Sequence, residues 1–347
     1  MFKRVSHHFI FVILACMSIL ANARADNTKP VYALTDTLHF PGATRWDLLT
    51  FDAKQNRLFI ARGDSVDILD VATRKIVSSI PANGAHSIAL APEFGRGFIS
   101  NGKSNTLTIF DLETLKPIST VPTGTKPDVV AYDDQTQQIF AADAGSGDMT
   151  VISAKDGTVI GTIKLDGQPE FIALDGKGKL YVNLEDKSQI DVVDTKTLKV
   201  TNHFDLAPNC EGPTGLAIDK AHDHLFSVCA NKNMLIIDAN NGKIIDTLPI
   251  GQHSDGAAFD EVTGLAFSSN GDGTLTVVGV DKGHYKVLQI VQTKVTARTM
   301  ALNPSTHTIY LAAAETEGFD PPTEQHPEAR PHIKPDTFMI LIVKASK

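Results

Sequence analysis

The sequence predicts an all-β fold, a seven-bladed β-propeller, on three observations. A short apolar run recurs seven times, and successive runs start 40 to 44 residues apart, a period typical of propellers and other repeat arrays. Each run is followed by a polar turn and by further short apolar pieces bounded by Gly, Asn, Asp and Pro, as expected of strands. The last copy lacks a fourth piece, and a spare strand precedes the first copy. The seven runs start at Asp47, Ser87, Asp128, Glu170, Thr214, Asp255 and Arg298.

Residues 1–25 are expected to be a signal peptide and not part of the fold. Two basic residues precede an apolar stretch over residues 9–20, which is too short to span a bilayer. An A-x-A pattern then predicts cleavage near Ala25–Asp26. Cys16 is a weaker alternative as a lipid-attachment site, because the apolar stretch continues beyond it. We therefore expect the protein to be secreted into the periplasm.

Composition favours one large domain over residues 26–347. Removing the expected signal peptide would take away three basic residues and change the net charge from −8 to −11. An acidic chain is poorly suited to nucleic acids, because binding to their phosphate backbone depends on Lys and Arg. No second stretch is apolar enough to be a transmembrane segment. The sequence leaves the oligomeric state open.

Each copy is interpreted as four consecutive strands. The opening run carries almost no charge, as expected for a strand that is covered on both faces. The third piece alternates apolar and small residues and often ends in Asp, and the fourth piece is more exposed. In the second copy these pieces are residues 87–91, 97–101, 107–111 and 116–121.

The ends of the chain predict how the ring closes. The seventh copy supplies three strands, at 298–302, 309–312 and 338–343, and residues 31–38 form the spare strand. Pairing of this N-terminal strand into the last blade would close the ring and remove open sheet edges, which favour aggregation.

The largest insertion, residues 315–335, lies in the seventh copy and contains five prolines and two histidines. Proline cannot donate a hydrogen bond within a sheet, so we expect a loop on the channel-mouth face. It is either a lid over the mouth or a surface loop. As a lid it would add His326, His332 or Glu324 to a binding site.

Several segments resemble a known family. The pieces GFISN at Gly97 and LYVN at Leu180 resemble the YVTN-type repeat. Together with CEGPTGLAID at Cys210, FSSNGDGTLTVV at Phe267 and TARTMAL at Thr296, they make the chain similar to the YncE-like family of exported seven-bladed β-propellers. The resemblance implies a periplasmic binding protein and no particular chemistry. Quinoprotein dehydrogenases, which are also propellers, are disfavoured by the single Trp and the seven copies.

The candidate site follows from this fold, because the opening strands of a propeller line its central channel. Polar residues at the starts of these strands should meet at one channel mouth, where converging titratable groups favour a binding site. The alternative is that the acidic residues only cap strand ends and solvate the rim. The expected mouth residues are Trp46, Asp47, His86, Ser87, Lys126, Asp128, Glu170, Glu211, Thr214, His253, Asp255 and Arg298.

Two functions fit such a mouth. The favoured one is a binding protein for a small molecule or a protein partner, because no nucleophile–base pair is recognisable and G-x-S-x-G is absent. The alternative is a metal-assisted hydrolase, lyase or lactonase. Glu211 and Asp255 would then be bases or ligands of Ca²⁺ or a borderline divalent ion, His86 or His253 a general acid–base, and Arg298 an oxyanion partner. No other cofactor is indicated, and no short spacing of metal ligands supports the cation.

Two cysteines, Cys210 and Cys229, remain after the expected cleavage. An even number in an oxidising compartment favours a disulfide. Antiparallel pairing of the first two strands of the fifth copy would bring the two positions together. A redox or metal-binding thiol pair is the weaker alternative without a C-x-x-C motif, and the absence of C-x-x-C-H excludes covalent haem.

Overall fold

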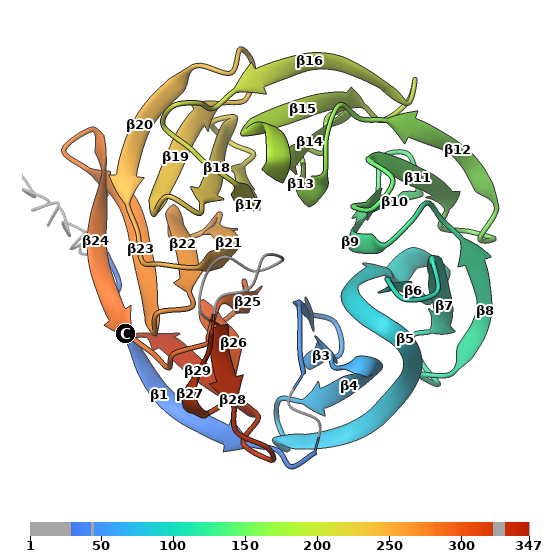
Figure 1. Ribbon diagram of the computed structural model, residues 1–347, viewed down its shortest axis with the longest axis horizontal. Helices are drawn as coiled ribbons and strands as arrows, with labels where there is room; N and C mark the ends of the chain where they lie inside the picture. Colours follow the sequence, from blue (N-terminus) through green and yellow to red (C-terminus); the bar gives the residue numbers. More distant parts are fainter. Residues whose placement is uncertain (1–28, 43–44, 322–329, 347) are drawn as a thin grey trace, which may run out of the picture.

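A computed structural model describes residues 29–42, 45–321 and 330–346. The expected signal peptide and the lid candidates Glu324 and His326 lie outside these residues. Within the described ranges, five four-stranded sheets are separate, and the first two blades share one seven-stranded sheet. Figure 1 shows the sheets arranged as blades around a central opening. The predicted seven-bladed, all-β propeller is thus confirmed.

The two inner strands of each blade surround the opening. The innermost strands are β2 (Leu49–Asp52), the second half of β5 (Lys75–Ala91), β9 (Pro127–Asp133), β13 (Pro169–Leu174), β17 (Pro213–Asp219), β21 (Ser254–Asp260) and β25 (Thr299–Asn303). The second strands are β3 (Arg57–Ala61), β6 (Arg96–Asn101), β10 (Gln138–Asp143), β14 (Lys179–Leu184), β18 (His224–Cys229), β22 (Leu265–Asn270) and β26 (Thr308–Ala313).

The two outer strands complete each blade. The third strands are β4 (Gly63–Asp70), β7 (Thr106–Asp111), β11 (Asp148–Ser153), β15 (Gln189–Asp194), β19 (Asn233–Asp238), β23 (Thr274–Asp281) and β29 (Met339–Ala345). The fourth are β1 (Tyr32–His39), the first half of β5, β8 (Pro117–Pro122), β12 (Val159–Lys164), β16 (Lys199–Asp205), β20 (Ile244–Pro249) and β24 (His284–Gln292). Two short 3₁₀ helices connect strands: η1 (Pro92–Phe94) lies between β5 and β6, and η2 (Glu185–Lys187) lies between β14 and β15. No helix in the described ranges is long and apolar enough to cross a membrane.

The N-terminal strand completes the last blade, as expected. β1 pairs antiparallel with β29, with Leu34 opposite Val343 and His39 opposite Met339. β29 in turn pairs with β26, and β26 with β25. The two ends of the described chain therefore share one sheet, which leaves β1 at the outer edge of the blade that neighbours the first.

Strand β5 is long because it serves two blades. Its first half pairs with β4, and its second half, from Ala85 to Ala91, pairs with β6. The chain thus passes from the outside of blade one to the channel without an intervening loop. This crossing carries His86 to the channel.

Burial differs between the strands of a blade. Every residue of β3 and β22 is buried, whereas β9 mixes buried and half-buried residues and β8 is mostly exposed. The expectation that the opening strand is covered on both faces therefore holds better for the second strand. The innermost strand has one edge on the channel, which leaves part of it open to solvent.

The hydrophobic core is divided among the contacts between blades. One apolar cluster joins blades one and two through Phe59, Ile68, Ile99 and Phe110, all buried. Equivalent clusters join each further pair of neighbours, including the last and first blades through Tyr310 and other residues. Apolar burial between neighbours stabilises the ring as a whole, because each blade needs both neighbours to cover its faces.

Aspartates at strand ends hold the turns. Asp260, at the end of β21, accepts hydrogen bonds from the backbone N–H groups of Val262 and Thr263. Asp70, at the end of β4, accepts from the backbone N–H and hydroxyl of Thr73, which holds the pKa of Asp70 below its usual range. This side-chain bonding to the following backbone is the preferred use of Asp in turns. It explains why so many pieces of the repeat end in Asp.

The insertion in the last blade contains strands where a loop was expected. β27 (Thr316–Asp320) and β28 (Arg330–Ile333) form an antiparallel pair. Pro331 lies in β28 opposite Phe319, and a register shift separates this pairing from that of Thr316. Proline is tolerated because this two-stranded ladder has free edges, where an N–H is not needed.

Candidate functional site

Irregular pairing at the beginnings of the innermost strands shapes the site. In β9, Pro127 pairs with Asp143 and Val130 with Ala141, so two residues of β9 face a single residue of β10. Similar register shifts occur at the starts of β13, β17 and β21 and within β5. Such a β-bulge bends a strand and redirects a side chain. The residues placed in these bulges include His86, Asp128, Glu170 and Asp255.

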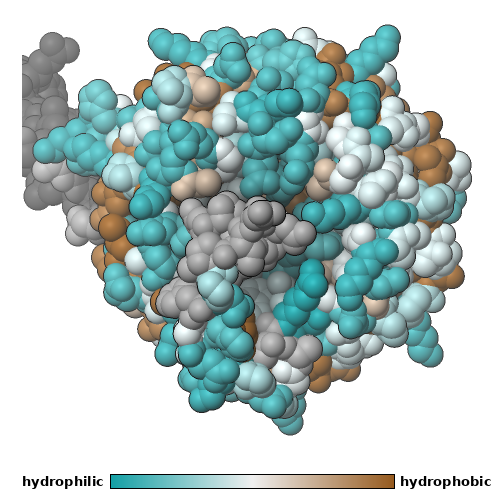
Figure 2. All heavy atoms as spheres, viewed as in Figure 1, coloured by the Kyte–Doolittle hydropathy of each residue, from teal (hydrophilic) through white to brown (hydrophobic). Residues whose placement is uncertain are grey.

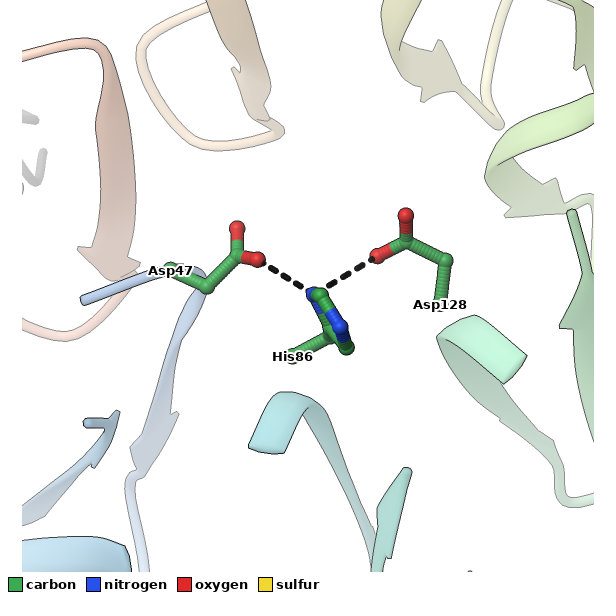
Figure 3. Close-up of side chains that lie close together, drawn as sticks. All are labelled: Asp47, His86 and Asp128. Atoms are coloured by element: carbon green, nitrogen blue, oxygen red, sulfur yellow. Dashed lines mark hydrogen bonds and ion pairs between the residues drawn. The ribbon is translucent and has the colours of Figure 1, made fainter. Parts of the chain in front are cut away.

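Three mouth residues from the first three blades lie in contact. The Nδ1 atom of His86 is 2.6 Å from Asp47 Oδ2 and 3.6 Å from Asp128 Oδ1. Figure 3 shows the imidazole between the two carboxylates, with one ring nitrogen directed to both. One ligand atom from each residue lies within 4.8 Å of the other two. The three side chains remain accessible to solvent, with 25% of Asp47, 14% of His86 and 22% of Asp128 exposed.

A glycine sets the orientation of the His86 ring. A Cβ atom on Gly102, which follows β6, would lie 2.6 Å from His86 Nε2 and 2.8 Å from its Cδ2. These distances are far below van der Waals contact, so any larger residue would displace the ring. Gly102 therefore lets the Nε2 edge pack against the loop and leaves Nδ1 facing the carboxylates.

Buried hydroxyl groups of neighbouring blades hold the backbone of the mouth residues. Thr299 Oγ1 donates to the carbonyl of Asp47 at 3.0 Å, and Ser100 Oγ donates to the carbonyl of Asp128 at 2.5 Å. Both hydroxyl-bearing residues are buried. The carbonyl of Arg298 has an equivalent partner on β22. These bonds fix the positions of the mouth residues across the joints between blades.

Two further pairs complete the mouth. Gln168 Nε2 is 3.4 Å from Glu170 Oε1 and 3.2 Å from Glu185 Oε2, so one amide bridges two carboxylates of blade four. Asp255 Oδ2 is 3.3 Å from the Nε of Arg298. Among the described residues, the mouth therefore combines five carboxylates with the imidazole of His86 and the guanidinium of Arg298, which contact three of them.

Burial and mutual repulsion raise the pKa values of two of these carboxylates, so these two ionise less readily. Burial raises the pKa of Asp128 to about 6, with the charge of Asp47 adding to the rise and His86 opposing it. Burial and the charges of Asp128, Glu185 and Asp255 raise the pKa of Glu170 to about 9. Like charges that share a partly dehydrated site oppose one another's ionisation.

The remaining groups of the mouth respond to the same field. Burial raises the pKa of Asp255, although the charge of Arg298 opposes the rise. The same ion pair raises the pKa of the Arg298 guanidinium. Burial alone would lower the pKa of His86, but its hydrogen bond to Asp47 and the charge of Asp128 outweigh burial and raise it. The mouth is thus an acidic site that favours positive charge.

Trp46 lies in a joint between blades and not at the mouth as expected, whereas Glu211 and His253 are exposed at the mouth end of their blades. The Trp46 ring lies 5.6 Å from the ring of Phe338 and belongs to the apolar cluster between the last and first blades. Glu211 and His253 have exposed side chains, and their carbonyl groups accept backbone hydrogen bonds from the neighbouring loops. The metal candidate Glu211 is outside the group of close ligand atoms among the described residues. The large ring of Trp46 therefore fills a joint between blades.

Of the other polar residues expected at the mouth, two form hydrogen bonds with the backbone and one is exposed. Thr214 Oγ1 donates to the carbonyl of Ser254 at 3.0 Å, which ties blade five to blade six. Ser87 Oγ accepts from the N–H of Val130 at 3.3 Å. Lys126 is exposed, and its charge opposes the rise in the pKa of Asp128.

His332, the lid candidate that the structure describes, is engaged within its own hairpin. Its Nδ1 is 3.1 Å from Asp320 Oδ1, and its Nε2 is 3.6 Å from Glu317 Oε1. The side chain is 54% exposed. These contacts stabilise the β27–β28 pair and give His332 no contact with the carboxylates of the mouth.

Sequence reasoning missed Glu185 and Gln168. Gln168 directly precedes β13, at the entry to an opening strand, but is not among the predicted mouth residues. Glu185 instead begins η2, which connects β14 to β15, and connections between second and third strands share the mouth face. An acidic residue directly after the LYVNL segment was the available signal.

The predicted disulfide is present. Cys210 and Cys229 are bonded and fully buried. Cys210 precedes β17 and Cys229 ends β18, and Pro213 pairs with Cys229 across these strands. The bond therefore fastens the loop that enters blade five to the neighbouring strand at the mouth end.

Comparison with known proteins supports the family resemblance. No protein-family profile matches the chain. The chain is 24% identical over 206 residues to the uncharacterized protein YncE of Escherichia coli O157:H7, a match that spans 54% of this chain and 57% of YncE. A solved chain of hydrazine synthase from Kuenenia stuttgartiensis superposes with a TM-score of 0.68 at 16% identity, over 80% of this chain and 93% of that one. This structural likeness shows the fold alone. The resemblance to YncE-like propellers that the repeats predicted is thereby confirmed.

Proposed function

We propose that the protein is a binding protein whose channel mouth takes a small, positively charged ligand. The observation that carries this proposal is the gathering of five carboxylates from four blades around one opening, with Arg298 as the only guanidinium that contacts them among the described residues. The five are Asp47, Asp128, Glu170, Glu185 and Asp255.

The electrostatic cost of this arrangement supports the proposal. Gathering carboxylates in a partly dehydrated site is unfavourable, and the raised pKa of Glu170 expresses that cost. A bound cation would offset the repulsion and allow the carboxylates to ionise. A positively charged ligand would therefore gain more binding free energy at the mouth than at an ordinary acidic surface.

The surroundings of the mouth favour a polar ligand. Figure 2 shows a face that is mainly hydrophilic, with hydrophobic residues chiefly at the outer rim. Exposed apolar side chains lie on the outer strands, among them Val77, Ile118 and Val159. We also infer that the protein works in an oxidising, exported environment, because the Cys210–Cys229 disulfide is typical of such compartments.

Thermal unfolding with matched ligands tests the proposal. Small organic ammonium compounds and divalent cations, each at a fixed ionic strength and pH 8, should raise Tm, whereas carboxylates of similar size should not. A ligand at 100 times its Kd stabilises by about 2.7 kcal/mol. The double variant Glu170→Gln, Asp255→Asn should lose most of the shift that the organic ammonium compounds cause.

Glu211→Gln is the matched control, because it removes an exposed carboxylate at the mouth end of blade five. The control should respond to cations as the unaltered protein does. Equal shifts in the double variant and the unaltered protein, or stabilisation by anions instead of cations, would contradict the proposal.

A further inference from the structure

The contact of Asp47, His86 and Asp128 suggests which cation binds. One ligand atom from each residue lies within 4.8 Å of the other two. We infer that these three side chains form a site for a borderline divalent metal ion of the Mn²⁺ to Zn²⁺ type. This inference rests on the proposed function, since it names the ligand class of the same mouth.

The donor set determines the ion class. An imidazole nitrogen and two carboxylate oxygens suit Zn²⁺ and other first-row ions, whereas Ca²⁺ and Mg²⁺ prefer oxygen donors alone. Three protein ligands leave positions free for water or for a further ligand, as in catalytic and not structural zinc sites. The nearby pair of Glu170 and Glu185 adds negative charge that would strengthen the binding of a divalent ion.

The three ligands are held by separate contacts to the scaffold. The carbonyls of Asp47 and Asp128 are fixed by Thr299 and Ser100, and the His86 carbonyl accepts from the N–H of Leu48 at 3.0 Å. The ring itself packs against the loop at residue 102. Binding would therefore demand side-chain rotation and not backbone rearrangement, which limits the entropic cost.

This assignment replaces the metal candidates expected from sequence. Asp255 is paired with Arg298 at 3.3 Å, and a guanidinium beside a carboxylate competes with a metal ion for the same oxygen. Glu211 is exposed. By contrast, the His86 Nδ1 lies between two carboxylates that form no ion pair with a guanidinium among the described residues, although Arg45 adds positive charge near His86.

Calorimetric titration of the chelator-treated, purified protein with Zn²⁺ tests the inference. We expect one ion per chain in this site, with an affinity that falls at least tenfold in His86→Ala and in Asp128→Asn. His203→Ala is the matched control, because His203 Nδ1 also lies 2.7 Å from an aspartate, Asp191, on an outer part of blade four. The control should bind Zn²⁺ as the unaltered protein does.

A second measurement does not depend on the variants folding. Acylation of histidine by diethyl pyrocarbonate, followed by peptide mass analysis, should be blocked by Zn²⁺ at His86 and not at His203. Co²⁺ in place of Zn²⁺ should give visible absorption that reports nitrogen and oxygen ligation.

The outcomes separate the two proposals. If organic ammonium compounds stabilise the protein while Zn²⁺ neither binds nor protects His86, the metal site is overturned and the cation-binding function stands. Zn²⁺ binding that is equally strong in His86→Ala overturns the site as well. One Zn²⁺ per chain, lost in the two ligand variants and kept in His203→Ala, supports it.

Discussion

The two ends of the innermost strands use aspartate in opposite ways. At the far end, Asp219 and Asp260 accept hydrogen bonds from the backbone of the turns that follow them. At the mouth, Asp47 and Asp128 depend on the side chain of His86 from another blade. An aspartate that is satisfied by its own turn stabilises the fold. One that depends on a neighbouring side chain can exchange that partner for a ligand.

The largest expected effect on stability comes from a comparison of variants at the two ends of β21. Asp260, at the far end of β21, is buried and also lies 2.7 Å from His307 Nδ1. Asp260→Ala should lower the free energy of unfolding by about 3 kcal/mol, because it breaks a buried pair and leaves turn N–H groups unpaired. Urea unfolding at pH 7 measures the loss.

Asp255→Ala, at the mouth end of the same strand, is the matched comparison. Its effect on stability should stay within about 1 kcal/mol, since burial already disfavours the ionised carboxylate. Comparable losses in the two variants would mean that mouth aspartates are structural, and the distinction between the two ends would fail.

The disulfide tests whether stability and binding at the mouth are separable. Its closed loop spans 19 residues of sequence. Replacing both cysteines by serine should cost about 3 kcal/mol in the chain-entropy account. Cation-induced stabilisation should persist, because neither cysteine belongs to the carboxylate group. Loss of the cation response in a variant that remains folded would show that the loop entering blade five shapes the site.

Sequence reasoning predicted the fold well because the repeat is local. Each copy carries its own apolar runs and turn residues, and the spare strand at 31–38 has a unique place in an incomplete last blade. The entries to the opening strands likewise led to Asp47, His86 and Asp128. A period of about 42 residues brings such positions together without any knowledge of side-chain contacts.

The same reasoning misplaced Trp46 and overlooked Glu185, for a physical reason. Glu185 lies beyond the end of β14 and not at a strand start. At the strand starts, β-bulges change the direction of side chains without a clear sequence signal. Trp46 points to a joint between blades, whereas Glu170 turns to the channel. Strand order could therefore be predicted, but side-chain direction at the strand starts could not.

The pH dependence of stability sharpens the comparison at Glu170. Its pKa is raised to about 9 in the folded protein, so the folded state keeps a proton that the unfolded state releases above its ordinary pKa. This contribution to stability is greatest below pH 4.5 and is lost as pH rises towards 9. In Glu170→Gln it should be absent.

Unfolding free energies at several pH values from 5 to 9 check this sign. The difference between the unaltered protein and Glu170→Gln should change by up to about 1.4 kcal/mol per pH unit, the value for one proton. The variant should be the more stable at high pH. Glu211→Gln serves as the control, and parallel curves for all three proteins would show that Glu170 ionises normally.

The smallest expected effect concerns the hydroxyl groups that hold the mouth backbone. Ser100→Ala removes the hydrogen bond to the Asp128 carbonyl and should cost about 1 kcal/mol of stability. It should also weaken cation binding several-fold, because the carboxylate loses its fixed backbone. Ser119→Ala, an exposed position on β8, should change neither property. A loss of stability in Ser100→Ala with unchanged cation affinity would assign this hydroxyl to the joint between blades alone, and the carboxylates would then be positioned by their contacts with one another.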